Sequence, residues 1–416
     1  MKDTDRMKMD TLPEPDAHQQ DKTLKTASAR RRMMAALAAA FFCGSFFTLG
    51  VGGAYLRWQQ QSHAAITEKL EEIENLIDQY YLYDVDEEAA ANGIATGYAD
   101  ALDVYSCYRD KEAYEEFQAH NDGDLCGIGI TVAQYGSDAL NVLYLLDDSP
   151  AAGILQPGDA IVGVEGESVE SLGYTGAVAK IQGEAGTSVQ LTIRRNDELM
   201  DVSVERADVV NSGIYFQQFD QIGYLRISAF NNATPAAFKE AIEELMQQGV
   251  SGLIFDLRGN GGGLLTSVSE MLDYVLPAGD LVSKTDKDGK TVVMYTSDDD
   301  CIDLPMAVLV NESTASAAEL FACDLQEYGV AVVVGTTTYG KGVMQTTYNL
   351  SDGSSLTLTT DYYNPSSGQN YNGVGVIPDI ECPLTEEQQK DFVHFDPDHD
   401  PQLASALEAL SGEKTS

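Results

Sequence analysis

The stretch that decides the fold is Met306-Ala-Val-Leu-Val-Asn-Glu-Ser-Thr-Ala-Ser-Ala-Ala-Glu319. Its first five residues, 306–310, form a short apolar run that predicts a buried strand, and a second such run follows at 331–335. Ser316 therefore lies where a strand turns into a helix. Lys341 lies 25 positions later, on the loop that leaves the next strand. We expect the two side chains to meet, because a serine hydroxyl is a weak nucleophile unless a nearby base takes its proton.

The use of histidine supports a lysine as that base. None of the five histidines lies between Gly223 and Ile380 or in a context typical of a catalytic histidine. A lysine can act as a base if burial lowers its pKa from ~10.4 toward ~7–8. Two glycines, at 340 and 342, flank Lys341 and allow a close approach of backbone and substrate. Gln345 could orient the amine through its side-chain carbonyl.

Structural interpretations of the same residues compete with the catalytic one. Ser316 could be a helix N-cap, a role for which Ser313 and Thr314 also compete. Lys341 could be a solvated loop lysine. The turn Gly259-Asn-Gly-Gly-Gly263 could bind phosphate, but its spacing is not G-x-G-x-x-G and no Gly-Lys-Ser/Thr motif is present at 340–342. Asp256 and Arg258, just before this turn, are expected to pair or cap locally.

Several blocks, taken in order, carry a resemblance to a known family. The chain between Gly223 and Ile380 resembles the catalytic core of the C-terminal processing (tail-specific) serine proteases. The blocks that carry it are 223–227 with Phe230, 253–264, 316–319, 339–345, 352–356 and 373–380. The resemblance implies a serine endopeptidase with a crotonase/ClpP-like protease core built on a mixed sheet, over residues 210–385. It implies no metal, nucleotide or other cofactor.

The resemblance also implies a role for individual residues. Ser316 is similar to the family's nucleophile, Lys341 to its general base and Gln345 to the residue that positions the lysine. The implied oxyanion hole consists of the backbone N–H groups of Ala317 and Gly263. Such preorganised donors are worth roughly 10²–10³ in rate each. Two other functions compete with this one: a catalytically silent PDZ scaffold that binds tails, and an acyl-CoA enzyme of the crotonase type.

The segment 125–209 resembles a PDZ domain, on the motifs Gly127-Ile-Gly-Ile130, 149–153, 157–159 and 162–166. A PDZ domain takes a peptide as an added strand and holds its terminal carboxylate in backbone N–H groups. Gly127, Ile128, Gly129 and Ile130 are expected to form that carboxylate-binding cradle, with 175–181 as the groove helix. The implied partners are proteins or peptides bound through their C-terminal tails, and the domain could also gate the active site.

The N-terminal part predicts a membrane attachment. Residues 1–32 are polar and end in three arginines, and they read as a disordered cytoplasmic tail. Residues 33–56 carry no charge and are long enough to span a bilayer, which predicts a single-pass transmembrane helix with the protease outside the cytoplasm. A cleaved signal peptide is the alternative. Residues 62–122 predict a helical region, with helices at 64–81, 87–101 and 111–117. In the family this region helps to build a homodimer, but a plain spacer is an equal interpretation.

Length, charge and cysteine content limit the remaining interpretations of the chain. The length of 416 residues suits a multidomain α/β (α+β) protein, and the net charge of −41 argues against nucleic-acid binding. Five cysteines follow the predicted anchor, and Cys107 could pair with Cys126, or Cys301 with Cys323; buried free thiols are the equal alternative. Residues 386–416 predict an acidic C-terminal tail with a helix at 401–410 and no calcium-loop pattern. Family members trim exported proteins or act in developmental signalling, and the sequence does not choose between these.

Overall fold

The computed structural model describes residues 64–134, 136–146, 148–385, 388 and 397–411. It divides into two compact units, Met1–Glu87 and Glu88–Ser416. In the first unit residues 64–80 form a helix with almost all side chains exposed, as the apolar spacing predicts. The predicted cytoplasmic tail and membrane anchor, 1–32 and 33–56, lie outside the described residues. No helix in the described ranges is both long enough and apolar enough to cross a membrane.

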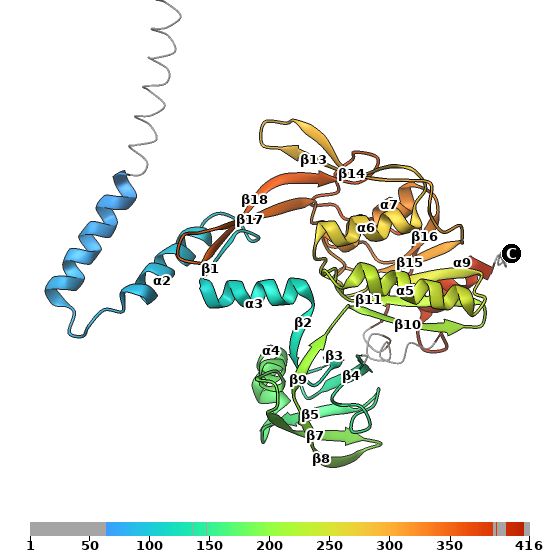
Figure 1. Cartoon of the computed structure of the whole chain (residues 1–416), viewed down its shortest axis with the longest axis horizontal. Helices are drawn as coiled ribbons and strands as arrows, with labels where there is room; N and C mark the ends of the chain where they lie inside the picture. Colours follow the sequence, from blue (N-terminus) through green and yellow to red (C-terminus); the bar gives the residue numbers. More distant parts are fainter. Residues whose placement is uncertain (1–63, 135, 147, 386–387, 389–396, 412–416) are drawn as a thin grey trace, which may run out of the picture. The chain divides into compact units, whose positions relative to one another are not determined.

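A six-stranded, mostly parallel sheet forms the centre of the second unit (Figure 1). Only its first pair of strands is antiparallel, and the others run parallel. In spatial order the strands are β10 (Ile214–Phe219), β11 (Ile222–Ile227), β12 (Gly252–Asp256), β15 (Met306–Val310), β16 (Ala331–Gly335) and β19 (Ile380–Glu381). The two strands predicted from the apolar runs at 306–310 and 331–335 therefore have the predicted bounds. They are neighbours in the sheet, with Val308 opposite Val333.

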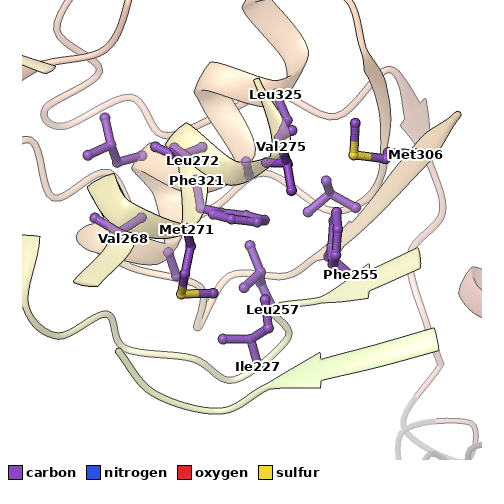
Figure 2. Close-up of a cluster of buried hydrophobic side chains, with 14 of the residues drawn as sticks. Ile227, Phe255, Leu257, Val268, Met271, Leu272, Val275, Met306, Phe321 and Leu325 are labelled. Carbon is purple, nitrogen blue, oxygen red and sulfur yellow. The ribbon is translucent and has the colours of Figure 1, made fainter. Parts of the chain in front are cut away.

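One face of this sheet is covered by three helices, α5 (Thr234–Gln247), α6 (Leu265–Val275) and α7 (Ala317–Glu327). Side chains alternate between the two faces of a strand, and Leu253 and Phe255 of β12 both enter the core under these helices. Figure 2 shows Phe255 and Phe321 within this core. Their ring centroids are 5.4 Å apart and the rings meet edge to face, an arrangement that aromatic pairs prefer.

The other face of the sheet buries residues of two distant segments. Ile254 and Leu309 point to this side, where they meet Leu403 of α9 (Pro401–Ser411). Tyr144 of β4 (Leu140–Leu145) packs here too, and its ring stacks on Tyr215 of β10 with centroids 4.7 Å apart. Both faces of the parallel sheet are therefore buried, as is usual for parallel sheets.

The second unit also contains a five-stranded antiparallel sheet. It consists of β1 (Cys107–Arg109), β18 (Ser355–Asn364), β13 (Gly279–Asp286), β14 (Thr291–Ser297) and β17 (Val343–Asn349), which pairs with β18. Strand β1 comes from far upstream in the sequence and pairs with the first part of β18, with Cys107 opposite Thr357. This pairing brings the segment around residue 105 to the C-terminal half of the chain.

The segment that resembles a PDZ domain folds into its own sheet and helix. The strands are β3 (Ile130–Ala133), β4, β5 (Ala160–Val164), β6 (Glu167–Ser168), β7 (Ser188–Arg195) and β8 (Glu198–Glu205). Its helix α4 (Val169–Ile181) starts before the predicted 175–181, because Ser168 caps it and Gly173 bends it at φ 66°. Strands β2 (Asp124–Gly127) and β9 (Ala207–Val210) pair where the chain enters and leaves this domain.

Two helices precede the PDZ segment in the second unit. Helix α2 (Glu87–Ala99) has nearly the predicted bounds, and α3 (Lys111–Asp122) extends beyond the predicted end at 117. Helix α3 continues because its polar side chains still favour a helix, and it ends where Gly123 adopts φ 82°. The five described cysteines, at 107, 126, 301, 323 and 382, are all free thiols, so neither suggested disulfide is formed.

Candidate active site

Three neighbouring parallel strands deliver the predicted site to one edge of the central sheet. Ser316 follows β15, Lys341 lies on the loop after β16, and the glycine-rich turn at 259–263 follows β12. The carboxyl ends of parallel strands lie at the same edge, where ligands of open α/β sheets commonly bind. Residues more than fifty positions apart in the sequence are therefore brought together by topology alone.

Ser316 occupies a strained turn between β15 and α7. Its backbone has φ 60° and ψ −123°, which is uncommon for a residue with a Cβ. The turn is possible because Gly262 lies against it: a Cβ on Gly262 would be 2.8 Å from the Cβ of Ser316. Strain of this kind persists only where surrounding structure enforces it, and it is commonly found at functional sites. Ser316 is also the N-cap residue of α7, so the capping and catalytic interpretations describe one position.

Glu319 joins the serine turn to the lysine loop, a role that the sequence analysis did not assign. Its buried carboxylate accepts hydrogen bonds from the backbone N–H of Ser316 and of Lys341, each at 2.8 Å. It also accepts from the N–H of Gly340 at 2.6 Å and from the hydroxyl of Thr338 at 2.5 Å. A Ser-x-x-Glu pattern at a helix start is a signal that could have identified part of this arrangement.

Lys341 is largely shielded from solvent. Burial lowers the pKa of its amine from the ordinary value, while the carboxylates of Glu319 and Asp103 act in the opposite direction. The amine lies 4.5 Å from the ring centroid of Tyr105, a residue that the sequence analysis did not single out. The segment carrying Tyr105 is held by Asp103, which accepts a hydrogen bond from Thr359 on β18 at 3.0 Å. A lysine with a lowered pKa can be a neutral base near neutral pH.

Two buried tyrosines support the same pair of residues. The Tyr363 hydroxyl donates to the Lys341 carbonyl and is in hydrogen-bond contact with the Ser316 side chain. The hydroxyl of Tyr371, which has one proton to donate, lies 3.2 Å from the Tyr363 hydroxyl and 3.3 Å from the Ser316 carbonyl. Burial raises the pKa of both phenols, which keeps them as neutral hydrogen-bond donors.

A cavity of about 710 Å³ is lined by every residue predicted for the catalytic site. These are Ser316, Lys341, Gln345, Ala317 and Gly263. Ala317 begins α7, and the first amides of a helix have no acceptor within it. Gly263 has φ 147° and lies so close to Phe230 that a Cβ would be 2.1 Å from the Phe230 carbonyl oxygen. The structure brings these five residues together, and their individual roles stay predictions.

Gln345 reaches the cavity but makes a different contact from the predicted one. Its amide nitrogen donates to the hydroxyl of Thr359 at 3.3 Å and to the Val343 carbonyl at 3.4 Å. Within the described part of the chain, no hydrogen bond joins Gln345 to the Lys341 amine. In this structure the Lys341 amine lies against Tyr105 instead. The role of Gln345 in positioning the lysine therefore stays a prediction.

Asp256 and Arg258 form a buried ion pair at the base of the glycine-rich turn, as the sequence predicts. The Arg258 guanidinium meets Asp256 at 2.6 Å and Asp400, which precedes α9, at 2.8 Å. Burial opposes ionisation of Asp256, but Arg258 and then Arg226 hold the pKa of that carboxyl below its usual range. The pair fixes the end of β12, from which the turn with Gly263 departs.

The predicted carboxylate cradle lines a second, smaller cavity of about 60 Å³ in the PDZ segment. Gly127, Ile128, Gly129 and Ile130 all lie on it, opposite Val178 and Ile181 of α4. Gly129 has φ 69°, and a Cβ there would be 2.8 Å from the Ser149 hydroxyl, so only glycine fits this turn. The four residues are therefore placed at a groove between a strand and a helix, and binding of a carboxylate there stays a prediction.

Comparison with known proteins identifies both segments. Residues 221–382 match peptidase family S41, and residues 142–195 match the PDZ domain. A probable CtpA-like serine protease of Staphylococcus aureus (strain COL) is 32% identical over 331 residues, which cover 78% of this chain and 66% of that protein. The chain thus spans slightly less than two thirds of the length of this relative.

One solved structure with a TM-score above 0.5 is similar in fold. A putative S41 protease from Bacteroides fragilis has a TM-score of 0.53 and 18% identity, covering 75% of this chain and 87% of that one. The photosystem II D1 C-terminal processing protease has a TM-score of 0.47 and 28% identity, with 76% and 86% covered. The predicted mixed α/β fold with a PDZ domain and a protease core is confirmed, and so is the resemblance to the C-terminal processing proteases.

Proposed function

We propose that this chain, which carries a peptidase family S41 domain and a PDZ domain, is a serine endopeptidase. Its substrates would be proteins that it recognises by their C-terminal tails and then processes or degrades. One observation carries the proposal: Ser316 and Lys341 line the same cavity as Ala317 and Gly263. The strained turn at Ser316 and the lowered pKa of Lys341 support it, because each has a cost to stability that a purely structural role does not require.

In the proposed mechanism the neutral Lys341 amine takes the proton of the Ser316 hydroxyl as its oxygen attacks a peptide carbonyl. The N–H groups of Ala317 and Gly263 stabilise the oxyanion that forms. The Lys341 ammonium then gives its proton to the departing amine, and an acyl-enzyme ester on Ser316 remains. A water molecule, deprotonated by Lys341, then attacks the ester carbonyl. The Ser316 oxygen leaves and takes the proton from the Lys341 ammonium, which restores the hydroxyl and the neutral amine.

The PDZ groove would hold the substrate tail while the cut is made. The cradle at 127–130 suits the terminal carboxylate of a peptide, and the apolar side chains of α4 suit an apolar side chain on its last residue. The partners we propose are therefore unfolded or flexible protein tails, and the PDZ domain would recognise them and gate the active site. A catalytically silent tail-binding scaffold is the alternative.

We further propose that residues 33–56 anchor the chain in the cell membrane and that the protease lies outside the cytoplasm. The uncharged segment and the three arginines before it support this orientation. Proteinase K added to intact spheroplasts should remove a C-terminal epitope tag, whereas protection of the tag until lysis would contradict the orientation. A cleaved signal peptide would instead yield a shorter chain in the soluble fraction.

The proposed homodimer rests on the exposed apolar side chains of the helix at 64–80. Ile73 is 45% exposed and Leu76 52% exposed, although both lie on the apolar stripe predicted from the sequence. Sedimentation of the full chain in detergent should give twice the monomer mass. Replacing both residues with serine should give a monomer if this helix forms the contact.

The test of the activity compares the full chain with single-residue variants on dephosphorylated β-casein, an unfolded substrate. Cleavage products identified by mass spectrometry should appear with wild type and be absent with Ser316→Ala and Lys341→Ala. Ser313→Ala is the matched control, because Ser313 is an exposed serine on the same loop and competes with Ser316 in the sequence. Cleavage that survives Ser316→Ala would remove the assignment, and binding without cleavage by wild type would favour the silent scaffold.

A further inference from the structure

The cavity that contains Ser316 has a second cation, Arg109 of β1. Its guanidinium carbon lies 4.0 Å above the ring centroid of Phe117 on α3, and its Nη1 donates to the hydroxyl of Thr357 at 2.9 Å. The ring and the hydroxyl hold the planar group in place but do not neutralise its charge. Arg109 is therefore a fixed positive charge on the wall of the site where we place the substrate.

Arg109 differs from the other described arginines because it has neither an acidic partner nor a full set of hydrogen bonds. The chain has 66 acidic and 25 basic residues. Among the described arginines, four form an ion pair with an aspartate: Arg194, Arg195, Arg226 and Arg258. Arg206 forms none, but its guanidinium donates to three backbone carbonyls. No carboxylate of the described residues lies within 4.0 Å of Arg109. Only one of the five N–H donors of its guanidinium has a hydrogen bond in the described structure, which is to Thr357. The planar fork of guanidinium donors matches the geometry of a carboxylate, which is the anionic group that a peptide supplies.

The strand β17 gives an estimate of how far Arg109 lies from Lys341 along the cavity. Four residues of β17 line the cavity, namely Val343, Met344, Gln345 and Thr347, and the strand has a bulge between the second and the third of them. Thr347 lies opposite Thr357, the residue that Arg109 contacts, while Lys341 lies two residues before Val343. The six-residue step from Lys341 to Thr347 therefore spans at most ~20 Å at about 3.3 Å per residue.

We propose that Arg109 forms a carboxylate-binding subsite for the peptide substrate, roughly four to six residues from the scissile bond for an extended peptide at about 3.3 Å per residue. This inference rests on the proposed function, because it concerns the substrate of that same cavity. The carboxylate is either an aspartate or glutamate side chain or the C-terminus of a short tail. Helix α3 contributes further residues to the lining beside Arg109, and they recur at helical spacing: Tyr114, Phe117, Gln118 and Asn121.

The first experiment measures binding and needs no catalysis. Full-length Ser316→Ala is titrated with rhodamine-labelled twelve-residue peptides in which a single glutamate moves through an otherwise uncharged sequence. Each peptide has a partner with glutamine at the same position, and all are amidated at the C-terminus. One or two adjacent positions should show a preference for glutamate of about 10- to 100-fold, the range expected for a charge-assisted hydrogen bond. In Ser316→Ala with Arg109→Gln the ratio should fall to near one.

The second arm separates the two sources of the carboxylate. Peptides that end in a free acid or an amide are compared in the same two proteins. The measured quantity is the ratio of affinities for the free-acid and the amidated peptide. The PDZ groove is intact in both proteins, so only the part of this ratio that is lost with Arg109→Gln is assigned to the subsite. If the preference for an internal glutamate is lost but the acid preference is not, the side chain is the ligand; the reverse result identifies the terminus.

A matched control and the kinetics complete the test. Arg194→Gln makes the same change in charge at an exposed ion pair in the PDZ segment, and it should leave every ratio unchanged. With otherwise wild-type protein, Arg109→Gln should lower kcat/KM for the glutamate peptide alone, whereas a structural role would lower it for both peptides equally. Equal ratios with and without Arg109 would overturn the subsite. Cleavage that persists in Ser316→Ala would instead overturn the proposed function, so the two failures are distinguishable.

Discussion

Replacing Glu319 with glutamine should weaken the site while leaving its shape almost unchanged. Each carboxylate oxygen of Glu319 accepts two hydrogen bonds, one pair from the Ser316 and Lys341 amides and the other from Gly340 and Thr338. A glutamine NH₂ group cannot accept. It would face Gly340, since the Thr338 hydroxyl can turn to act as the acceptor. The variant therefore loses one charge-assisted bond and weakens the others.

The size of the effect follows from these bonds. A hydrogen bond to a charged group contributes about 1.5–3 kcal/mol, so Glu319→Gln should cost ~2–4 kcal/mol in total. If the whole cost destabilised only the active arrangement of the site, kcat would decrease by about 30- to 1000-fold, because about 1.4 kcal/mol corresponds to a factor of ten. If part of this free-energy cost destabilises the whole fold instead, the free energy of unfolding decreases. Thermal unfolding of the variant is therefore measured together with kcat.

The pH profile separates this explanation from a general loosening of the fold. The Glu319 carboxylate raises the pKa of Lys341 against the effect of burial. Its removal should lower that pKa further and move the acid limb of the kcat profile to lower pH, because more of the lysine is neutral. Loosening would hydrate the amine, raise its pKa and move the limb to higher pH. Glu312→Gln, at an exposed glutamate bonded to Thr336, is the matched control. Wild-type kcat in Glu319→Gln, or a limb moved to higher pH, would refute the reasoning.

Three further predictions test other parts of the structure. Tyr363→Phe removes a hydroxyl that contacts the Ser316 side chain and the Lys341 carbonyl. It should lower kcat about 3- to 10-fold with KM unchanged, because one neutral hydrogen bond contributes ~1 kcal/mol. A change in KM alone would contradict this prediction. Lys341→Met should abolish cleavage yet raise stability at pH 7. Burial lowers the folded-state pKa of Lys341, so the unfolded chain binds more protons, and wild-type stability should rise with pH from that lowered pKa up to about 10.4. A lower melting temperature for Lys341→Met would contradict this. Phe321→Ala opens the aromatic core and should cost about 3–5 kcal/mol in urea unfolding, and a loss below about 1 kcal/mol would show that the core collapses around the gap.

The part of the fold that the sequence predicted best is the parallel sheet. Its strands are buried on both faces, so they appear in the sequence as continuous apolar runs such as 306–310 and 331–335. Their carboxyl ends meet at one edge, and this is why Ser316, Lys341 and the turn with Gly263 could be placed together before any coordinates. Local chemistry also predicted the Asp256–Arg258 pair, because two residues of opposite charge on one strand end need no tertiary information to meet.

Features that depend on an interruption within an element, or on the pairing of distant segments, could not be predicted in the same way. The start of α4 was missed because Gly173 interrupts the helical pattern, although Ser168 supplies a cap. The suggested disulfides were drawn from spacing, which carries no information on whether two thiols meet; Cys107 lies on β1, in the antiparallel sheet, while Cys126 lies on β2. Strand β1 is three residues long and only half-buried, so its sequence has no clear period to read.

This short strand has a large consequence for the site. By pairing with β18, β1 brings Tyr105 to the Lys341 amine and Arg109 to the cavity wall. An aromatic ring stabilises an ammonium by cation–π attraction, but it also excludes the water that would hydrate that ammonium. Burial is the larger of these influences on Lys341, because the pKa of its amine is lowered in spite of two nearby carboxylates. The segment around Tyr105 thus completes a site whose proposed nucleophile and base both lie in the C-terminal half. Residues 221–382, which match the peptidase family, therefore do not contain every group that affects the pKa of Lys341.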